Sequence, residues 1–154
     1  MVIKETQKPL LYERTLGMSV MEGKGFYYPN DAVVASNGKI YVLNRSLEAR
    51  GSGRGMRVTI CDSEDEFHGD FGQFGSGLGQ FMWPSAICEG PDQKIYITDE
   101  HLHKIMIFSS DGIFLKEWGQ LGSNPGDMDS PSGIAFSSEG ELFVSDTYNH
   151  RIQV

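Results

Sequence analysis

The chain has few cysteines, few cations and no long apolar run, which are the features of several common protein classes. Its 154 residues include only two cysteines, too few for a disulfide framework or a cysteine-based zinc motif. It lacks an apolar run long enough for a signal peptide or a bilayer span. Cations are scarce, since 13 Lys and Arg face 21 Asp and Glu and the formal net charge is −8. We therefore expect a soluble, cytoplasmic protein that binds no membrane and repels nucleic acid unless its cations cluster.

Helical periodicity is also lacking, because no stretch places its apolar residues at the spacing of one helix face. The length suits a single domain, and a hydrophobic content of 39% is enough for a packed core. What the chain has instead is an internal repeat anchored on Pro29, Pro84 and Pro131. Each proline is followed by an apolar segment (KIYVLN, KIYITD or ELFVSD) and then by a basic-apolar segment (RVTIC, KIMIF or RIQV).

The spacing of these prolines locates an insertion. Successive prolines are 55 and then 47 residues apart, and all other landmarks keep their register. The eight extra residues therefore lie between Asn44 and Arg57. The repeat extends through its glycines, because FHGDFGQFGSGLGQFMWP (67–84) matches FLKEWGQLGSNPGDMDSP (114–131) position for position. The N-terminal LLYERTLG (10–17) is similar to one more copy of the IFLKEWG strand.

Each repeat is expected to contain four short strands joined by turns rich in glycine and polar residues. In the first repeat these strands are AVVA, KIYV, RVTI and EFHGDFG, which we call strands a, b, c and d. Repeats of about 45 residues with four strands each are typical of a β-propeller, in which each repeat forms one blade. The predicted fold class is therefore an all-β propeller of four-stranded blades with strand a innermost. In this geometry the d–a and b–c loops share one face, and the a–b and c–d turns share the other.

The last repeat resembles a known family. SPSGIAFSSEGELFVSDTYNHRIQV (130–154) is similar to an NHL repeat, with its proline, Gly-Ile-Ala, LFVSD and terminal NHRIQV. The second repeat matches less well, because DEHLHKI (99–105) places Leu102 where the motif has asparagine. The resemblance covers roughly residues 25–154 and implies a propeller, most often of six blades. It also implies a platform for protein binding or, in some members, RNA binding. Related six-bladed enzymes include lactonases and a lyase of peptide amidation.

The predicted strands are too few to close the ring of a propeller. Residues 1–24 form an N-terminal segment with an orphan outer strand d (10–17), and residues 25–154 form three NHL-type repeats. The repeats cover residues 25–78, 79–125 and 126–154, the last lacking its outer strand. Three blades are half of a six-bladed ring, and open sheet edges invite pairing. Either the chain is the front half of a longer propeller, or a homodimer closes the ring, each N-terminal strand completing the other chain's last blade.

The insertion in the first repeat, RSLEARGSGRGMR (45–57), carries four of the six arginines and three glycines. A nucleotide-binding loop is excluded, because no Gly-Lys-Ser/Thr follows and the glycines miss the G-x-G-x-x-G spacing. Two interpretations stay open: a finger that binds an anion or a partner through its guanidinium groups, or a mobile loop whose arginines keep it soluble. The candidate arginines are Arg45, Arg50, Arg54 and Arg57.

The same face of the propeller supplies the other candidate ligand- or partner-binding residues. Polar residues next to the repeated prolines are expected at the mouth of the central channel, and one histidine has no counterpart in the repeat. Two histidines alone lack a third ligand for a zinc site, so no metal ligand is assigned. These candidates are Asn30, Asp31, Ser85, His101 and Ser132.

Five residues occupy two positions that recur between repeats, and they are assigned to the structure of the blades. Asn44, Asp99 and Asp146 follow strand b, where a side chain is expected to accept hydrogen bonds from amides of the b–c loop. His103 and His150 each precede the basic residue of strand c. Their repetition favours a structural role over a catalytic one.

Aromatic residues gather just before strand a, and two interpretations of them stay open. Such residues pack between blades, or they line a ligand groove at the rim of the channel. They are Phe26, Tyr27, Tyr28, Phe81 and Trp83.

Two classes of function are compatible with these patterns. The first is an interaction module that grips a protein or a small ligand, with no cofactor. The second is a hydrolase or lyase with a metal in the central channel, for which calcium or zinc would be the cofactor. The converging acceptors that such an enzyme needs are not visible in these three repeats, and no catalytic residue is assigned. RNA binding is disfavoured by a pI near 4.9.

Overall fold

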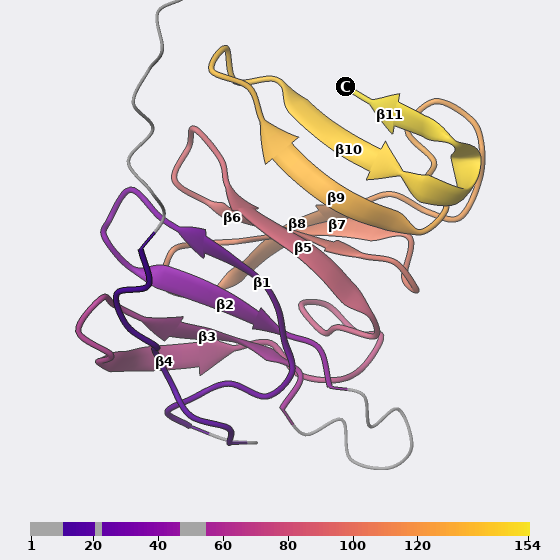
Figure 1. Cartoon of the computed structure of the whole chain (residues 1–154). Helices are drawn as coiled ribbons and strands as arrows, with labels where there is room; N and C mark the ends of the chain where they lie inside the picture. The colour runs from indigo at the N-terminus through magenta and orange to yellow at the C-terminus, as the bar shows by residue number, and fades with distance from the viewer. Residues whose placement is uncertain (1–10, 21–22, 47–54) are drawn as a thin grey trace, which may run out of the picture.

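The computed structural model describes residues 11–20, 23–46 and 55–154, whose regular structure is almost entirely strand (Figure 1). The strands are β1 (Pro29–Val34), β2 (Ile40–Asn44), β3 (Arg57–Cys61), β4 (Phe67–Phe71), β5 (Pro84–Glu89), β6 (Ile95–Asp99), β7 (Lys104–Phe108), β8 (Phe114–Trp118), β9 (Pro131–Phe136), β10 (Leu142–Asp146) and β11 (Arg151–Gln153). A 3-10 helix, η1 (Thr147–Asn149), joins β10 to β11. Within the described residues, none of the helical structure has the length and apolar character needed to cross a membrane.

The strands form three antiparallel sheets in which each strand pairs with its neighbour in sequence. The orders are β1-β2-β3-β4, β5-β6-β7-β8 and β9-β10-β11. We call these sheets the first, second and third blades. The predicted strands a, b, c and d are confirmed in the first two blades, and strands a, b and c in the third. The predicted all-β architecture, with three blades' worth of propeller and an incomplete last blade, is therefore confirmed.

Strand a begins at the repeated proline, two or three residues earlier than predicted. Proline has no N–H to donate, so it is tolerated at the first residue of a strand. In each blade the proline pairs across the ladder with the polar residue that ends strand b, and the register shifts beside this pair. The pairs are Pro29 with Asn44, Pro84 with Asp99, and Pro131 with Asp146.

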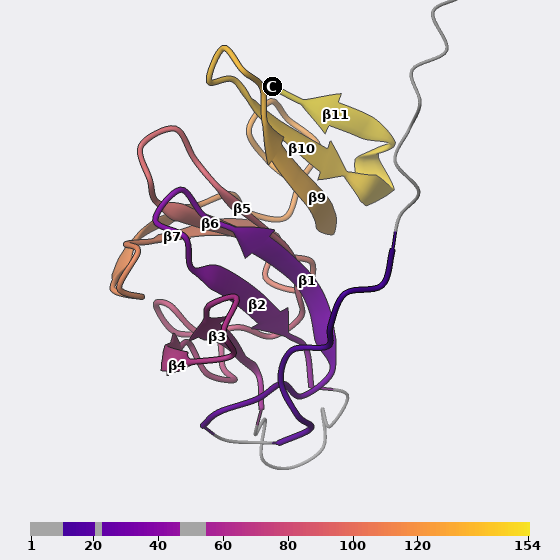
Figure 2. The same cartoon turned by 60° about the vertical axis from the view of Figure 1, so that its left-hand side comes forward.

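The first strands of the three blades lie side by side, and the blades fan out from them (Figures 1 and 2). β1 contacts β5, and β5 contacts β9. Side chains join these inner strands: Asn30 Nδ2 donates to the carbonyl of Ser85 (2.6 Å), and the Ile87 amide donates to Asp31 (2.9 Å). Ser85 Oγ donates in turn to the carbonyl of Pro131 at 2.9 Å. The expected innermost position of strand a is thus observed.

Two apolar clusters hold neighbouring blades together. Between the first and second blades, Phe108 is 1% exposed, and its ring centroid lies 4.8 Å from that of Phe71 and 5.8 Å from that of Phe81. Between the second and third blades, the rings of Tyr96 and Phe136 meet edge to face at 4.9 Å. Phe81 therefore packs between blades, which is one of the two interpretations of the aromatic residues before strand a.

An isolated parallel bridge joins the two ends of each d–a loop, and a glycine with positive φ stands at the start of the loop. Gly72 has a φ of 79°, and a Cβ added there would lie 2.2 Å from the ring of Phe81. Gly17 repeats this arrangement, with a φ of 77° and a distance of 2.4 Å to the ring of Phe26. The bridged pairs are Ser19 with Phe26, Phe74 with Phe81, and Leu121 with Met128.

Gly72→Ala is expected to lower the free energy of unfolding by about 2–3 kcal/mol, since left-handed strain adds to a forced shift of the Phe81 ring. Gly38→Ala is the matched control, because Gly38 has a φ of 80° but nothing within 4 Å of an added Cβ. Strain alone should cost that variant about 1 kcal/mol. Urea denaturation of the two variants measures the difference, and equal losses would contradict the role given to the Phe81 contact.

The N-terminal segment sits against the first blade as strand d of a preceding blade would. Arg14 donates to the carbonyl of Ser63 (2.8 Å), and the Gly17 amide donates to Asp65 (2.9 Å). Strand d of the first blade packs on the equivalent turn of the second, where Phe71 meets Gly112. Residues 11–17 have no strand beside them in the single chain and form no strand. The orphan outer strand at 10–17 therefore stays a prediction about pairing with another blade, and residue 10 lies outside the described residues.

Candidate functional site

A buried polar side chain ends strand b in every blade: Asn44, Asp99 and Asp146 are each 0% exposed. Each accepts a hydrogen bond from the backbone N–H two positions before the repeated proline. The donors are Tyr27 at 2.8 Å, Met82 at 2.8 Å and Asp129 at 2.7 Å. The sequence predicts donors in the b–c loop, whereas the donor shared by all three blades lies in the d–a loop.

The second blade also shows the predicted donors. The amides of His101 and Leu102, in the b–c loop, donate to Asp99 at 3.1 and 3.0 Å. The amide of Glu100 donates to the carbonyl of Trp83 at 3.0 Å. One buried carboxylate therefore clamps the b–c and d–a loops together, and the two loops share a face as predicted.

In the third blade the equivalent carboxylate, that of Asp146, is surrounded by hydrogen-bond donors. Burial acts to raise the pKa of the Asp146 carboxyl, but hydrogen bonds from the Asp129 amide and from Asn149, Arg151 and Gln153 outweigh burial and hold the pKa below its usual value. Arg151 Nε lies 2.8 Å from the carboxylate, and Gln153 Nε2 lies 2.9 Å from it. Asp146 is therefore an ionised anchor for strand c.

A pocket of about 330 Å³ opens on this loop face between the second and third blades. Trp83 and Ser130 come from d–a loops, and Tyr148 comes from η1 of the third blade. The b–c loop of the second blade adds two polar side chains, Glu100 and His101. Two aromatic surfaces with polar groups between them suit a ligand that has both a flat apolar part and hydrogen-bonding groups.

Arg45 lies beside this pocket at the start of the arginine-rich insertion. Its guanidinium carbon is 4.2 Å from the ring centroid of Trp83, and its Nη2 is 3.4 Å from Glu100 Oε2. Burial lowers the pKa of the Arg45 guanidinium and Glu100 opposes this, so the group stays cationic and stacks on the indole. The candidates Arg50 and Arg54 lie outside the described residues.

His103 also lines the pocket, and a backbone bond fixes its ring. The Ser130 amide donates to His103 Nδ1 at 3.1 Å, which places the proton of the neutral imidazole on Nε2. The same Nδ1 lies 3.5 Å from Asp129 Oδ1. We therefore assign His103 as a hydrogen-bond donor rather than a general base. His103 and His150 share a left-handed backbone, with φ values of 55° and 52°.

Residues 128–154, which include β9, β10 and β11, match the family model of the NHL repeat. The third blade is an NHL repeat. No curated protein is significantly similar to the chain in sequence.

Solved structures similar to this chain are propeller-like proteins. A catalytically inactive virginiamycin B lyase from Staphylococcus aureus, with quinupristin, has a TM-score of 0.60 and 17% identity over 89% of this chain and 39% of its own. A streptogramin B lyase has a TM-score of 0.57 and 18% identity over 80% of this chain and 36% of its own. The hydrazine synthase of Kuenenia stuttgartiensis has a TM-score of 0.54 and 16% identity over 93% of this chain and 38% of its own. The chain thus spans less than two-fifths of each of these relatives, and the similarity shows the fold.

Several predicted binding residues form hydrogen bonds within and between the blades. Asn30, Asp31 and Ser85 bond the inner strands to one another, as described above. Ser132 Oγ lies 2.6 Å from Thr147 Oγ1, at the start of η1. Each of these side chains already has a protein partner, and their contact with a ligand stays a prediction. Among the residues predicted to bind a ligand or partner, His101 lines the pocket on the loop face.

Arg57, predicted as a binding residue, lies in the interior, and its contact with a ligand or partner stays a prediction. Its side chain is buried, with the residue 5% exposed, and it pairs with Asp70 at 3.5 Å. The guanidinium also donates to the carbonyls of Val20, Gly23 and Gly25 at 3.2–3.4 Å. It holds the described part of the preceding d–a loop against the first blade. From the sequence, a basic residue at the start of strand c is expected to be exposed to solvent, because the sequence does not show which loop covers it.

Trp83, Glu100 and Tyr148 were not predicted as a site, although the sequence draws attention to Trp83 as an aromatic residue next to strand a. No sequence pattern relates Tyr148 to Trp83, which lies 65 positions earlier in the chain. Within residues 11–20, 23–46 and 55–154, no three His, Cys, Asp or Glu side chains are grouped so that they could hold a metal ion.

Proposed function

We propose that this NHL propeller chain is a binding module whose loop face takes a polypeptide segment of a partner protein. The pocket between Trp83 and Tyr148 carries this proposal, because it combines exposed aromatic surface with the polar residues Glu100, His101 and Ser130. Tyr148 is 68% exposed, so a partner can cover it without unfolding the blade. Aromatic residues of this kind dominate the energetics of protein interfaces.

Tyr148→Ala is expected to weaken binding of a selected peptide by about tenfold or more, because the variant loses one aromatic wall of the pocket. The probe is a phage-displayed random dodecapeptide library selected on the wild-type protein, with affinities measured by fluorescence anisotropy of the synthetic peptides. Ile113→Ala is the matched control, since Ile113 is 64% exposed but lies in a c–d turn on the opposite face.

Two results would contradict this proposal. One is the absence of any enriched peptide. The other is a set of peptides whose affinity falls with Ile113→Ala and not with Tyr148→Ala, which would move the binding surface to the other face.

A hydrolase or lyase activity is the second candidate, favoured by the placement of Glu100 and His101 on one pocket next to the donor His103. Calcium or zinc would be its cofactor. The first test is incubation with quinupristin, the compound present in one of the similar lyase structures, followed by liquid chromatography and mass spectrometry. A new product that disappears in His101→Ala would support this candidate. Intact quinupristin and a protein with no stoichiometric metal by elemental analysis would count against it.

A further inference from the structure

The residue directly before the repeated proline differs between the blades. It is Tyr28 in the first repeat, Trp83 in the second and Ser130 in the third. Trp83 lies in the d–a loop that joins the first two blades, and Ser130 lies at the equivalent place between the second and third. Ser130 lines the pocket of about 330 Å³ on the loop face. This pocket therefore has a small side chain where the preceding junction has an indole.

At the junction of the first two blades, an arginine of the chain lies on that indole. Arg45 extends from the b–c loop of the first blade, and its guanidinium carbon is 4.2 Å from the ring centroid of Trp83. The same group reaches the second blade, where its Nη2 is 3.4 Å from Glu100 Oε2. An aromatic face and a carboxylate thus hold one guanidinium between two blades. Both are groups that bind arginine in proteins generally.

The junction of the second and third blades has an acid at the position of this arginine. The residue after the buried acceptor of strand b is Arg45 in the first blade, Glu100 in the second and Thr147 in the third. Glu100 lines the pocket, and no Lys or Arg is among the described residues that line it. The charge at this position therefore changes from positive at the first junction to negative at the second.

Two carboxylates give the pocket its negative character. Glu100 lines it and is partly exposed. Asp129 adjoins it, because Asp129 Oδ1 accepts a hydrogen bond from Ser130 Oγ at 3.2 Å, and its side chain is also partly exposed. Within residues 11–20, 23–46 and 55–154, Glu100 Oε1 and Asp129 Oδ2 accept no hydrogen bond. Each carboxylate therefore has one oxygen available to a cationic donor.

The pocket also offers aromatic surface and a donor for a peptide group. Trp83 and Tyr148 both line it. A guanidinium is planar, so it can stack on such a ring while its N–H groups donate to a carboxylate. His103 lines the pocket with its Nδ1 occupied by the Ser130 amide, which leaves Nε2–H to donate to a backbone carbonyl. These groups match an arginine side chain together with the peptide that carries it.

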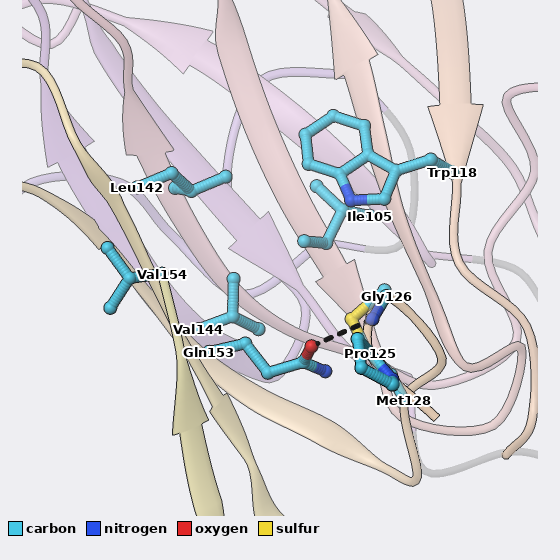
Figure 3. Close-up of a pocket in the computed structure, with 9 residues that line it drawn as sticks. All are labelled: Ile105, Trp118, Pro125, Gly126, Met128, Leu142, Val144, Gln153 and Val154. Carbon is cyan, nitrogen blue, oxygen red and sulfur yellow. Dashed lines mark hydrogen bonds between the residues drawn. The ribbon is translucent and has the colours of Figure 1, made fainter. Parts of the chain in front are cut away.

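The other pocket between these two blades has a different chemistry. It holds about 290 Å³ and is lined mainly by apolar side chains, among them Ile105, Trp118 and Leu142 (Figure 3). Its polar Gln153 is engaged within the chain, because the Gly126 amide donates to Gln153 Oε1 at 3.0 Å. None of the described side chains that line it is charged. A preference for a cationic side chain therefore belongs to the pocket on the loop face.

We propose that the polypeptide segment bound on the loop face is anchored by an arginine, whose guanidinium enters the pocket beside Ser130 and pairs with Glu100 and Asp129. This inference rests on the binding function proposed above and names the side chain that the pocket selects. The bound arginine repeats at the second junction the contact that Arg45 makes at the first. The net charge of −8 favours the approach of a basic segment.

The minimal probe is N-acetyl-arginine amide, titrated into the ¹⁵N-labelled chain and followed at the indole N–H cross-peak of Trp83 by NMR. The chain has two tryptophans, so the spectrum of Trp118→Phe identifies this peak. We expect a saturable shift, and a dissociation constant about tenfold higher for N-acetyl-citrulline amide, which keeps the shape and lacks the charge. Equal dissociation constants for the two amides, or no saturable shift, would overturn the proposal.

Two variants locate the arginine in this pocket. Ser130→Tyr fills the space, and the backbone can accept it, because Tyr28 holds the equivalent position with a φ of 51° and Ser130 has a φ of 53°. Binding of the arginine amide should be lost in Ser130→Tyr and weakened about fivefold in Glu100→Gln. The matched controls are Ser138→Tyr and Glu139→Gln, in an exposed a–b turn on the opposite face, and both should bind as the wild type does. Wild-type binding by Ser130→Tyr and Glu100→Gln would contradict the site.

The peptides selected on the wild type separate this inference from the binding function itself. Replacing one arginine of such a peptide by citrulline should raise its dissociation constant by about tenfold. Enriched peptides that lack arginine, or that keep their affinity with citrulline, would leave the binding module standing and overturn the arginine anchor. If no peptide is enriched, the binding function fails, and the titration with the two amides decides on the arginine site alone.

Discussion

Asp99→Ala is expected to lower the free energy of unfolding by about 3–5 kcal/mol, because it removes the shared acceptor of several buried amides. Asp99 is 0% exposed and accepts hydrogen bonds from the amides of Met82, Trp83, His101 and Leu102 at 2.8–3.1 Å. Alanine leaves these donors without their partner at the junction of two loops. Urea denaturation followed by circular dichroism measures the loss.

Asp99→Asn tests whether the acceptor or the charge matters. The first blade uses Asn44 at this position with a 2.8 Å bond from the Tyr27 amide, so an amide oxygen can serve there. We expect Asp99→Asn to lose about 1–2 kcal/mol, less than the alanine variant. Glu139→Ala, in an exposed turn, should stay within about 0.5 kcal/mol of the wild type. Equal losses from the two Asp99 variants would show that the charge dominates.

Phe108→Ala is expected to cost about 3–5 kcal/mol by opening a cavity between the first and second blades. The ring of Phe108 is nearly fully buried, and it meets the rings of Phe71, Phe81 and Phe114 at 4.8, 5.8 and 5.7 Å. Removing it leaves three aromatic rings without a common contact. Thermal unfolding by differential scanning calorimetry records the change as a lower Tm.

The control for Phe108 is Phe67→Ala, which deletes the same side chain at a position that is 38% exposed. Phe67 opens β4 at the edge of the first blade, and its loss should cost about 1 kcal/mol. A similar Tm for the two variants would mean that the space between these blades collapses without penalty. That result would contradict the role of Phe108 as the centre of the cluster.

The blades themselves could be predicted from the sequence because their determinants are local. A proline begins strand a, apolar residues form strands b and c, and glycines with positive φ lie in the loops. All of these residues recur at regular spacings in the repeat. The error at the start of strand a has a physical reason. The predicted strand a begins after Pro29, Pro84 and Pro131, but a proline can begin a strand when its nitrogen is not required by the ladder.

The candidate site could be predicted only in part, because its pocket depends on contacts between blades. The repeat places Asp99 at a loop, but the d–a amides that bind it belong to a different part of the repeat. Arg57 shows the same limit, since its burial depends on its contacts with Val20, Gly23 and Gly25. His101 lies on the loop face as expected. Tyr148, its neighbour across the pocket, comes from the next blade. The closeness of His101 and Tyr148 depends on how the blades pack side by side, which the sequence does not show.

The contact of Phe71 with the turn of the next blade has a consequence for how the chain unfolds. Phe71 ends strand d of the first blade, yet it packs on Phe108 and against Gly112 of the second. The outer strand of the first blade thus stabilises the second sheet as well as its own, which makes these neighbouring units thermodynamically dependent. Loss of one sheet removes part of the core of the next. The three sheets should therefore melt in a single cooperative transition, and native-state hydrogen exchange should show one shared opening energy for β3, β7 and the strands beside them.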